Sequence, residues 1–103
     1  MTNYRRGYNF EREVFEHFKN KIGVVSVTRS SGSHGILDII FFEEKRRVTG
    51  VQCKRDGKLF KQEKEELVRW SLRTKFPVLL ARRGSGDEKR IVLEQIYPIE
   101  EQK

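Results

Sequence analysis

Four residues have the types and spacing that metal-assisted chemistry at a phosphate requires: Asp38, Gln52 and Lys54 in mid-chain, with Glu11 upstream. Carboxylate and amide oxygens are the hard ligands that Mg²⁺ and Mn²⁺ prefer, and three such ligands leave positions for water and phosphate. The ammonium of Lys54 could orient an attacking water or neutralise charge in the pentacovalent state. The chemistry indicated is hydrolysis of a phosphodiester.

A β-hairpin would position three of these residues. The runs 36–42 (ILDIIFF) and 48–54 (VTGVQCK) are typical of strands, and the polar segment EEKRR between them is typical of a turn. If that turn is centred on its middle residue, Asp38 lies directly across from Gln52. Because side chains alternate faces with period two, Gln52 and Lys54 would share the face of Asp38, and the residues between them would face away. A bulge would break this register.

A helix would supply the fourth residue. With residues 8–22 helical, the apolar side chains fall in one core-facing sector, formed by Phe10, Val14, Phe15, Phe18 and Ile22. Glu11 lies inside that sector, where an unpaired charge costs on the order of several kcal/mol. Either a cation or a basic side chain must compensate it. Asp38, within an apolar strand, raises the same demand, and one divalent cation shared by both carboxylates is the simplest joint answer.

The charge balance favours a polyanionic partner. The chain has 22 Lys and Arg residues against 15 Asp and Glu residues, which gives a net charge of +7. A merely soluble basic surface is the other interpretation. The basic residues are spread over several segments, which predicts a charged face on a folded body: Arg5, Arg6, Arg12, Arg29, Arg46, Arg47, Arg55, Lys58, Lys61, Arg82 and Arg83.

Length and cysteine content narrow the setting. The 103 residues predict a single domain, 1–103, which would carry the nuclease chemistry. Its core would be modest, and association with a second copy would help to stabilise it. No apolar run approaches about 18 residues and no secretory segment opens the chain, which argues against a membrane role. The single Cys53 excludes an internal disulfide and a thiolate zinc cage, and it indicates a reducing, cytoplasmic setting. Core packing is the expected role of this thiol.

The remaining pattern predicts the fold class. Val24–Arg29 is typical of a strand, residues 60–75 of an amphipathic helix, residues 77–83 of a strand, and residues 91–96 of a last strand. The inner face of the second helix is expected to hold Phe60, Leu67, Val68, Ser71 and Leu72. The order αβββαβ, with one more short strand, indicates an α/β protein whose central mixed sheet is flanked by helices.

The segment 30–35 between the first two strands is rich in Ser and Gly. Its backbone N–H groups and hydroxyls, together with Arg29, could hold a phosphate, although a simple turn explains the composition equally well. His34 in this loop could be a general base, but an exposed side chain is the more ordinary role. Trp70, at the margin of the second helix's apolar sector, fits either the core edge or a subunit interface.

The sequence resembles the archaeal-type Holliday junction resolvases, a branch of the restriction-endonuclease-like fold found in archaea, their viruses and some phages. The resemblance runs over nearly the whole chain, in the segments RRGYNFERE, VTRSSGS, LDII, VQCKR and PVLLARR. It implies an Mg²⁺-dependent endonuclease, with Mn²⁺ as a substitute, that acts as a homodimer and nicks two opposed strands of a four-way DNA junction. Two-fold symmetry suits paired cuts, because they need two sites at a fixed separation.

The resemblance also implies roles for individual positions. Glu11, Asp38 and Gln52 would hold the metal, and Lys54 would be catalytic, with Arg29 and Ser31 in support. DNA contacts would come from Arg5, Arg6, Arg12, Arg29, Ser31, Ser33, Arg55 and Lys58. Such a protein would work in the cytoplasm of an archaeal, bacterial or virus-infected cell.

One position departs from the resolvase pattern, which usually has a second acid where this chain has Gln52. The segment VQCKR resembles the Q-x-K arrangement of some Mrr-type restriction endonucleases equally well. Three functions therefore stay open: a junction-resolving endonuclease, a restriction-type endonuclease, and a non-catalytic basic DNA-binding protein.

Overall fold

The computed structural model describes residues 3–29, 37–84 and 87–98, without the side chains of residues 3–8 and 87–89. Its elements are α1 (Asn3–Lys19), β1 (Val24–Arg29), β2 (Ile39–Glu43), β3 (Arg47–Cys53), α2 (Lys61–Thr74), β4 (Val78–Gly84) and β5 (Asp87–Tyr97). Neither helix of this described part is long and apolar enough to cross a membrane.

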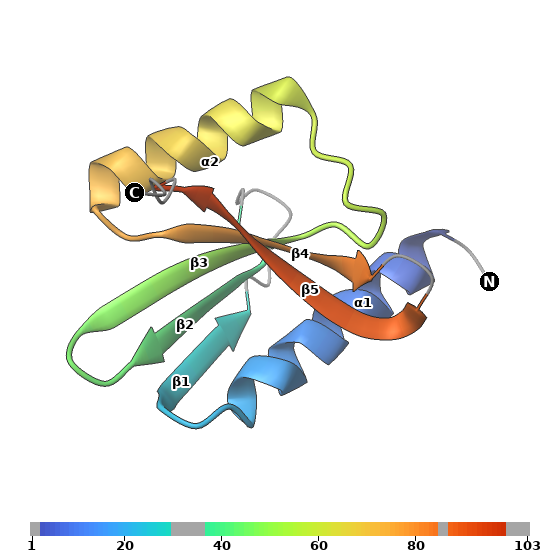
Figure 1. Ribbon diagram of the computed structural model, residues 1–103, viewed down its shortest axis with the longest axis horizontal. Helices are drawn as coiled ribbons and strands as arrows, with labels where there is room; N and C mark the ends of the chain where they lie inside the picture. The colour runs from blue at the N-terminus through green and yellow to red at the C-terminus, as the bar shows by residue number, and fades with distance from the viewer. Residues whose placement is uncertain (1–2, 30–36, 85–86, 99–103) are drawn as a thin grey trace, which may run out of the picture.

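The five strands form one sheet in the order β1-β2-β3-β4-β5 (Figure 1). All neighbours are antiparallel except β3 and β4, which are parallel because the chain crosses over through α2 between them. The predicted α/β class, with the order αβββαβ, one further strand and a mixed central sheet, is confirmed. The last strand is longer than predicted, because residues 87–90 pair with β4 instead of forming a loop.

Two core clusters occupy opposite faces of the sheet. The α1-side core consists of Phe10, Val14, Phe18, Ile39, Phe41, Val51 and Ala81, and the α2-side core consists of Leu37, Leu67 and Val78. In β2, Ile39 and Phe41 pack in the first cluster and Ile40 packs against the second, as the period of two requires. Figure 1 shows α1 and α2 apart from each other, and α1 contacts β1–β3 whereas α2 contacts β4 and β5.

Helix α1 begins earlier and ends earlier than its apolar pattern predicted. Phe10, Val14 and Phe18 are fully buried, and the ring of Phe18 stacks on that of Phe41 with centroids 4.2 Å apart. The prediction that Ile22 lies in the same buried sector is wrong, because Ile22 lies beyond the helix and is 97% exposed. The chain turns at residues 20–23, where Gly23 has a φ of 94°, so the periodicity continues for a turn after the helix has stopped.

Helix α2 buries a narrower stripe than predicted. Leu67 and Ser71 are buried, whereas Phe60 and Leu72, both predicted on the inner face, are 74% and 51% exposed. Ser71 can be buried because its hydroxyl donates to the carbonyl of Phe76 at 2.6 Å. The partly buried Trp70 packs against the α2-side core, which agrees with a place at the core edge, and the role in a subunit interface stays a prediction.

Candidate active site

The strand directions bring the candidate site residues to one edge of the sheet. Along the ladder, Arg29 pairs with Ile39, Ile39 with Val51, and Cys53 with Ala81. The ends of β1, β3 and β4 and the start of β2 therefore lie side by side, and we call this the site edge. Ligand sites of α/β sheets characteristically lie at the carboxyl ends of parallel strands, which here are β3 and β4.

Asp38 lies just before β2, at the site edge. Its N–H donates to the carbonyl of Val51 at 2.9 Å, and its Oδ2 accepts from the N–H of Cys53 at 2.7 Å. The partners of these two bonds, Val51 and Cys53, flank position 52, so Asp38 lies across the hairpin from Gln52. The turn of the hairpin is centred on Lys45, as the sequence indicated. The alternation of faces is nevertheless interrupted here, because Leu37 packs in the α2-side core and Ile39 in the α1-side core.

Glu11 and Asp38 repel each other electrostatically. Burial raises the pKa of Glu11 above 4.5, the charge of Asp38 raises it further, and the charge of Arg29 opposes both effects. Burial also raises the pKa of Asp38 above 3.8, although the Cys53 N–H and the charges of Lys54 and Arg29 act against it. The Asp38 carboxylate at the start of β2 thus lies close enough to Glu11 on α1 to destabilise the charged form of Glu11.

The burial of the Asp38 carboxylate has a testable effect on stability. Because the pKa of Asp38 is higher in the folded than in the unfolded state, its contribution to stability is fully present below the unfolded value near 3.8 and is lost as the pH rises through the folded value. We expect Asp38→Asn to raise the unfolding free energy by about 1 kcal/mol at pH 7. Urea titrations should show that gain disappearing below about pH 4. A gain that is independent of pH would contradict the assignment.

Gln52 supplies an unsatisfied oxygen at the same edge. Its Oε1 is buried and has no hydrogen-bond partner in the part of the chain described. A buried orphan acceptor is costly, and an oxygen-loving cation or a water would satisfy it. The neighbouring Gly50 lies against Leu37 and Trp70, so alternation places Gln52 on the α2 side of the sheet.

The donor set at the site edge consists of two carboxylates and one amide oxygen. Among residues 3–29, 37–84 and 87–98, no group of three or more His, Cys, Asp or Glu side chains could hold a metal ion. Two carboxylates, Glu11 and Asp38, and the orphan Oε1 of Gln52 are the oxygens that could hold Mg²⁺ or Mn²⁺. The sequence predicts these three oxygens as the metal ligands, and their joint binding of an ion stays a prediction.

Lys54 is fixed at both its backbone and its ammonium. Its N–H donates to the carbonyl of Ala81 at 2.9 Å, and the N–H of Arg83 donates to the carbonyl of Arg55 at 3.1 Å, so the β3–β4 ladder continues past Cys53. Its Nζ lies 2.7 Å from Oε2 of Glu63 on α2. Sequence analysis missed Glu63, because nothing in the pattern says which turn of α2 crosses the end of β3.

The basic residues predicted to contact DNA lie in different surroundings. The guanidinium of Arg29 lies 6.0 Å from the ring centroid of Phe15, and its charge lowers the pKa of both Glu11 and Asp38, which places it beside the two acids. Arg12 is exposed on α1.

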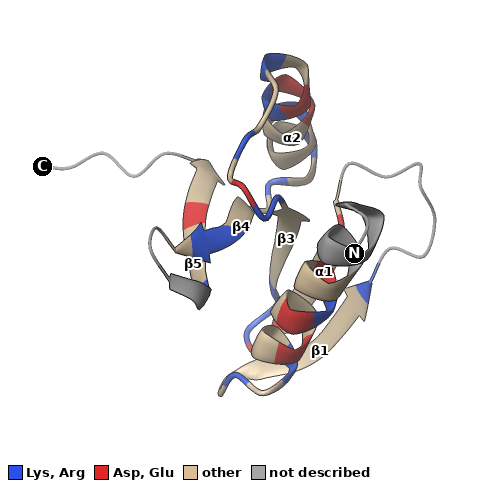
Figure 2. Ribbon diagram, turned by 90° about the vertical axis from the view of Figure 1, so that its right-hand side faces the viewer, with Lys and Arg blue, Asp and Glu red and all other residues tan. Residues whose placement is uncertain are grey.

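Figure 2 shows Lys and Arg at the end of β1, in the segment after β3 and at the end of β4, all at the site edge. In that segment, Arg55 is partly buried and Lys58 is exposed. Four further predicted residues fall outside what the structure describes: Ser31 and Ser33 entirely, and Arg5 and Arg6 in their side chains.

Cys53 has the packing role expected of it. It contacts the α1-side core, and burial followed by the charges of Asp38 and Glu11 raises the pKa of its thiol far above the ordinary value. A thiol held neutral in this way is a poor nucleophile. The thiol is therefore not a candidate nucleophile at the site edge.

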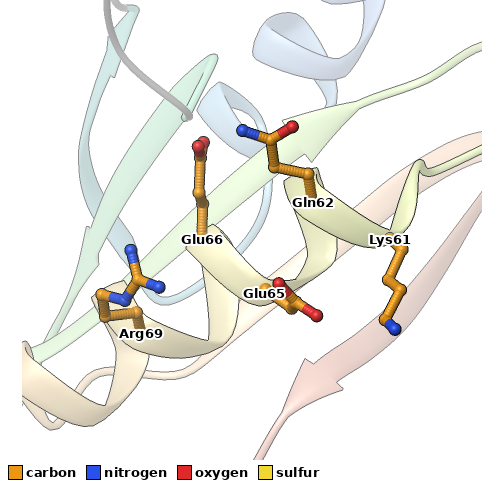
Figure 3. A pocket seen from close by; sticks show the side chains of 5 residues that line it. All are labelled: Lys61, Gln62, Glu65, Glu66 and Arg69. Atoms are coloured by element: carbon orange, nitrogen blue, oxygen red, sulfur yellow. The ribbon is translucent and has the colours of Figure 1, made fainter.

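Open pockets occur on α2. One of them is lined by Lys61, Gln62, Glu65, Glu66 and Arg69, and Figure 3 shows Gln62 and Glu66 projecting from the same side of the helix. None of the five residues belongs to the candidate site. The site edge itself is therefore identified by its charges and its orphan oxygen.

Comparison with known proteins supports the fold. Neither a family model nor a curated protein sequence matches this chain. The structure is similar to that of Hjc from Archaeoglobus fulgidus, a Holliday junction resolvase from an archaeal hyperthermophile, with a TM-score of 0.69 and 19% sequence identity. The match covers 95% of this chain and 79% of that protein. The likeness indicated by the motifs is thus confirmed at the level of the fold.

Proposed function

We propose that this chain is a divalent-metal-dependent endodeoxyribonuclease that resolves four-way DNA junctions. The observation that carries the proposal is the proximity of Glu11, Asp38 and Arg29 at the site edge, with the charge of Lys54 acting on Asp38. The orphan Oε1 of Gln52, at the end of β3, offers a further oxygen. The structural likeness to a protein described as a Holliday junction resolvase supports the choice of substrate. A net charge of +7 supports a DNA partner.

The residues divide the chemistry among them. Glu11, Asp38 and Gln52 would hold Mg²⁺, or Mn²⁺ in its place, and the bound ion would supply a polarised phosphate oxygen and an activated water. Lys54 brings a positive charge to the same edge, where it neutralises charge as the pentacovalent state forms. Arg29, the last residue of β1, adds a second cation that can contact a phosphate.

Two further parts of the proposal concern the assembly. A homodimer would place two sites at a fixed separation, as symmetric nicks on two opposed strands require. Its contacts with the phosphate backbone would come from the basic residues at the site edge, including Arg55 and Lys58, with Arg12 on α1. We place this activity in the cytoplasm of an archaeal, bacterial or virus-infected cell.

The direct test compares purified protein on four-way, forked and linear DNA, with Mg²⁺, with Mn²⁺ and with EDTA. We expect paired nicks in the four-way junction in the presence of either ion and no cleavage in EDTA, because the bound ion would supply both the activated water and the polarised phosphate oxygen. The proposal is wrong if the junction stays intact under all of these conditions. Measuring both strands separately also tests the paired geometry.

A restriction-type endonuclease of the same fold is the second candidate, and Gln52 favours it, since the Q-x-K arrangement also resembles the Mrr-type enzymes. Cleavage of linear duplex at defined sites, without preference for branches, would promote this candidate. A non-catalytic DNA-binding protein is the third, and it is motivated by the net charge alone. It predicts DNA binding that neither EDTA nor the loss of Asp38 affects.

A further inference from the structure

The ammonium of Lys54 is held by a residue outside the predicted site. Its Nζ lies 2.7 Å from Oε2 of Glu63, and the side chains of the pair are 27% and 30% exposed. The other oxygen of Glu63, Oε1, accepts from the backbone N–H of Phe60 at 3.1 Å, at the start of α2. Both oxygens are therefore engaged, so the carboxylate is fixed and acts on Lys54 rather than on a metal ion.

Glu63 is also close enough to act on Asp38. Its charge raises the pKa of the Asp38 carboxyl, and the charge of Lys54 lowers it. For Glu63 itself, burial would raise the pKa, but the hydrogen bonds from Lys54 and Phe60 outweigh it and leave the pKa below 4.5. The ammonium of Lys54 thus lies within the field of two carboxylates, one at the start of β2 and one on α2.

A lysine side chain needs such a partner if it is to act at one place. Its four-carbon stem is flexible, and ordering it costs conformational entropy. The ladder bonds at Lys54 and Arg55 fix only the backbone. The contact with Glu63 fixes the far end of the side chain, and the Phe60 N–H fixes Glu63 in turn.

We propose that Glu63 is a positioning residue for the phosphodiester cleavage proposed above: it holds the Lys54 ammonium at the site edge, beside Asp38. The inference rests on the proposed function for its catalytic part and on the Lys54–Glu63 contact for its structural part. It also assigns α2 a role, since the helix contributes no residue to the site indicated by the sequence.

The test uses Glu63→Gln, with Glu65→Gln as a matched control. A glutamine has a single side-chain oxygen, so it can keep at most one of the two contacts that Glu63 makes. Glu65 is exposed on the same helix, and its change to Gln removes the same charge. In single-turnover cleavage of a four-way junction, we expect a loss of roughly 10-fold for Glu63→Gln and none for Glu65→Gln. Junction affinity measured in EDTA should be unchanged in both variants.

A second readout does not depend on cleavage. Lysine NH₃⁺ groups give ¹⁵N-edited NMR signals when a bound partner slows their exchange with water, and Lys54→Ala identifies the signal of Lys54. We expect that signal in the wild-type protein and in Glu65→Gln, and its loss in Glu63→Gln. Thermal unfolding of each variant checks that the fold is retained.

The outcomes separate the inference from the proposed function. If the wild-type protein cleaves and Glu63→Gln cleaves at the same rate, or loses junction affinity by the same factor as rate, the positioning role is overturned. If the wild-type protein does not cleave, the proposed function is overturned, and the NMR signal alone decides whether Glu63 holds Lys54. A Lys54 signal that persists in Glu63→Gln overturns the inference in either case.

Discussion

Replacing Asp38 with Asn is expected to reduce metal-dependent cleavage by about 10³-fold while leaving the fold intact. Asparagine keeps an oxygen that can accept from the Cys53 N–H, as the carboxylate does at 2.7 Å. It removes one of the two negative charges, those of Glu11 and Asp38, that would be offered to a divalent ion. Hydrolysis then loses the ion's polarised oxygen and activated water together, which accounts for the size of the effect.

The measurement is the single-turnover rate on a four-way junction in saturating Mg²⁺. Asp56→Asn is the matched control, because Asp56 is an exposed carboxylate that accepts from the N–H of Lys58 within the segment after β3. The control should cleave at the wild-type rate. Junction binding in EDTA should be equal or tighter for Asp38→Asn, since a negative charge near the DNA has been removed. Equal rates for Asp38→Asn and the wild-type protein would exclude the site described here.

Replacing Phe18 with Ala is expected to lower the unfolding free energy by about 4 kcal/mol. The side chain is fully buried, and its ring stacks on that of Phe41. This contact joins α1, which carries Glu11, to β2, which starts beside Asp38. Loosening it should therefore also weaken whatever stabilisation Mg²⁺ gives, because the two carboxylates would no longer be held at a fixed separation.

Urea unfolding at pH 7, with and without Mg²⁺, measures both effects. Ile22→Ala is the informative control, because the apolar pattern placed Ile22 in the same buried sector and the structure leaves it 97% exposed. A surface substitution of this kind should change stability by no more than about 0.5 kcal/mol. A large loss for Ile22→Ala, equal to that of Phe18→Ala, would contradict the observed end of α1.

The hairpin could be predicted because its determinants are local. Two apolar runs around a polar turn fix which residues face one another, and the observed pairing of Ile39 with Val51 follows the turn centred on Lys45. The interruption of face alternation at Asp38 could not be derived in the same way. It depends on Leu37 packing against α2 while Ile39 packs against α1, and that choice is made by tertiary contacts.

The missed residue has a similar explanation. Glu63 can be recognised in the sequence as an acid in the first turn of a helix, and it forms the capping contact with the Phe60 N–H that such an acid commonly makes. Its contact with Lys54 depends on where α2, in the crossover between β3 and β4, packs on the sheet. That position follows from the packing of Leu67 on α2 against Val78 of β4, and Val78 is distant in the chain from both Lys54 and Glu63.

Gly50 sets how closely α2 can approach the sheet. A Cβ at this position would come within 2.8 Å of Cδ1 of Leu37 and 3.0 Å of the Trp70 ring, which α2 carries. The absence of a side chain at Gly50 thus lets the helix pack closely on the strand. A larger residue at position 50 would push α2 away from the sheet and move the carboxylate of Glu63 with it. The position of the Lys54 ammonium therefore depends on a contact at Trp70, two helical turns along α2 from Glu63.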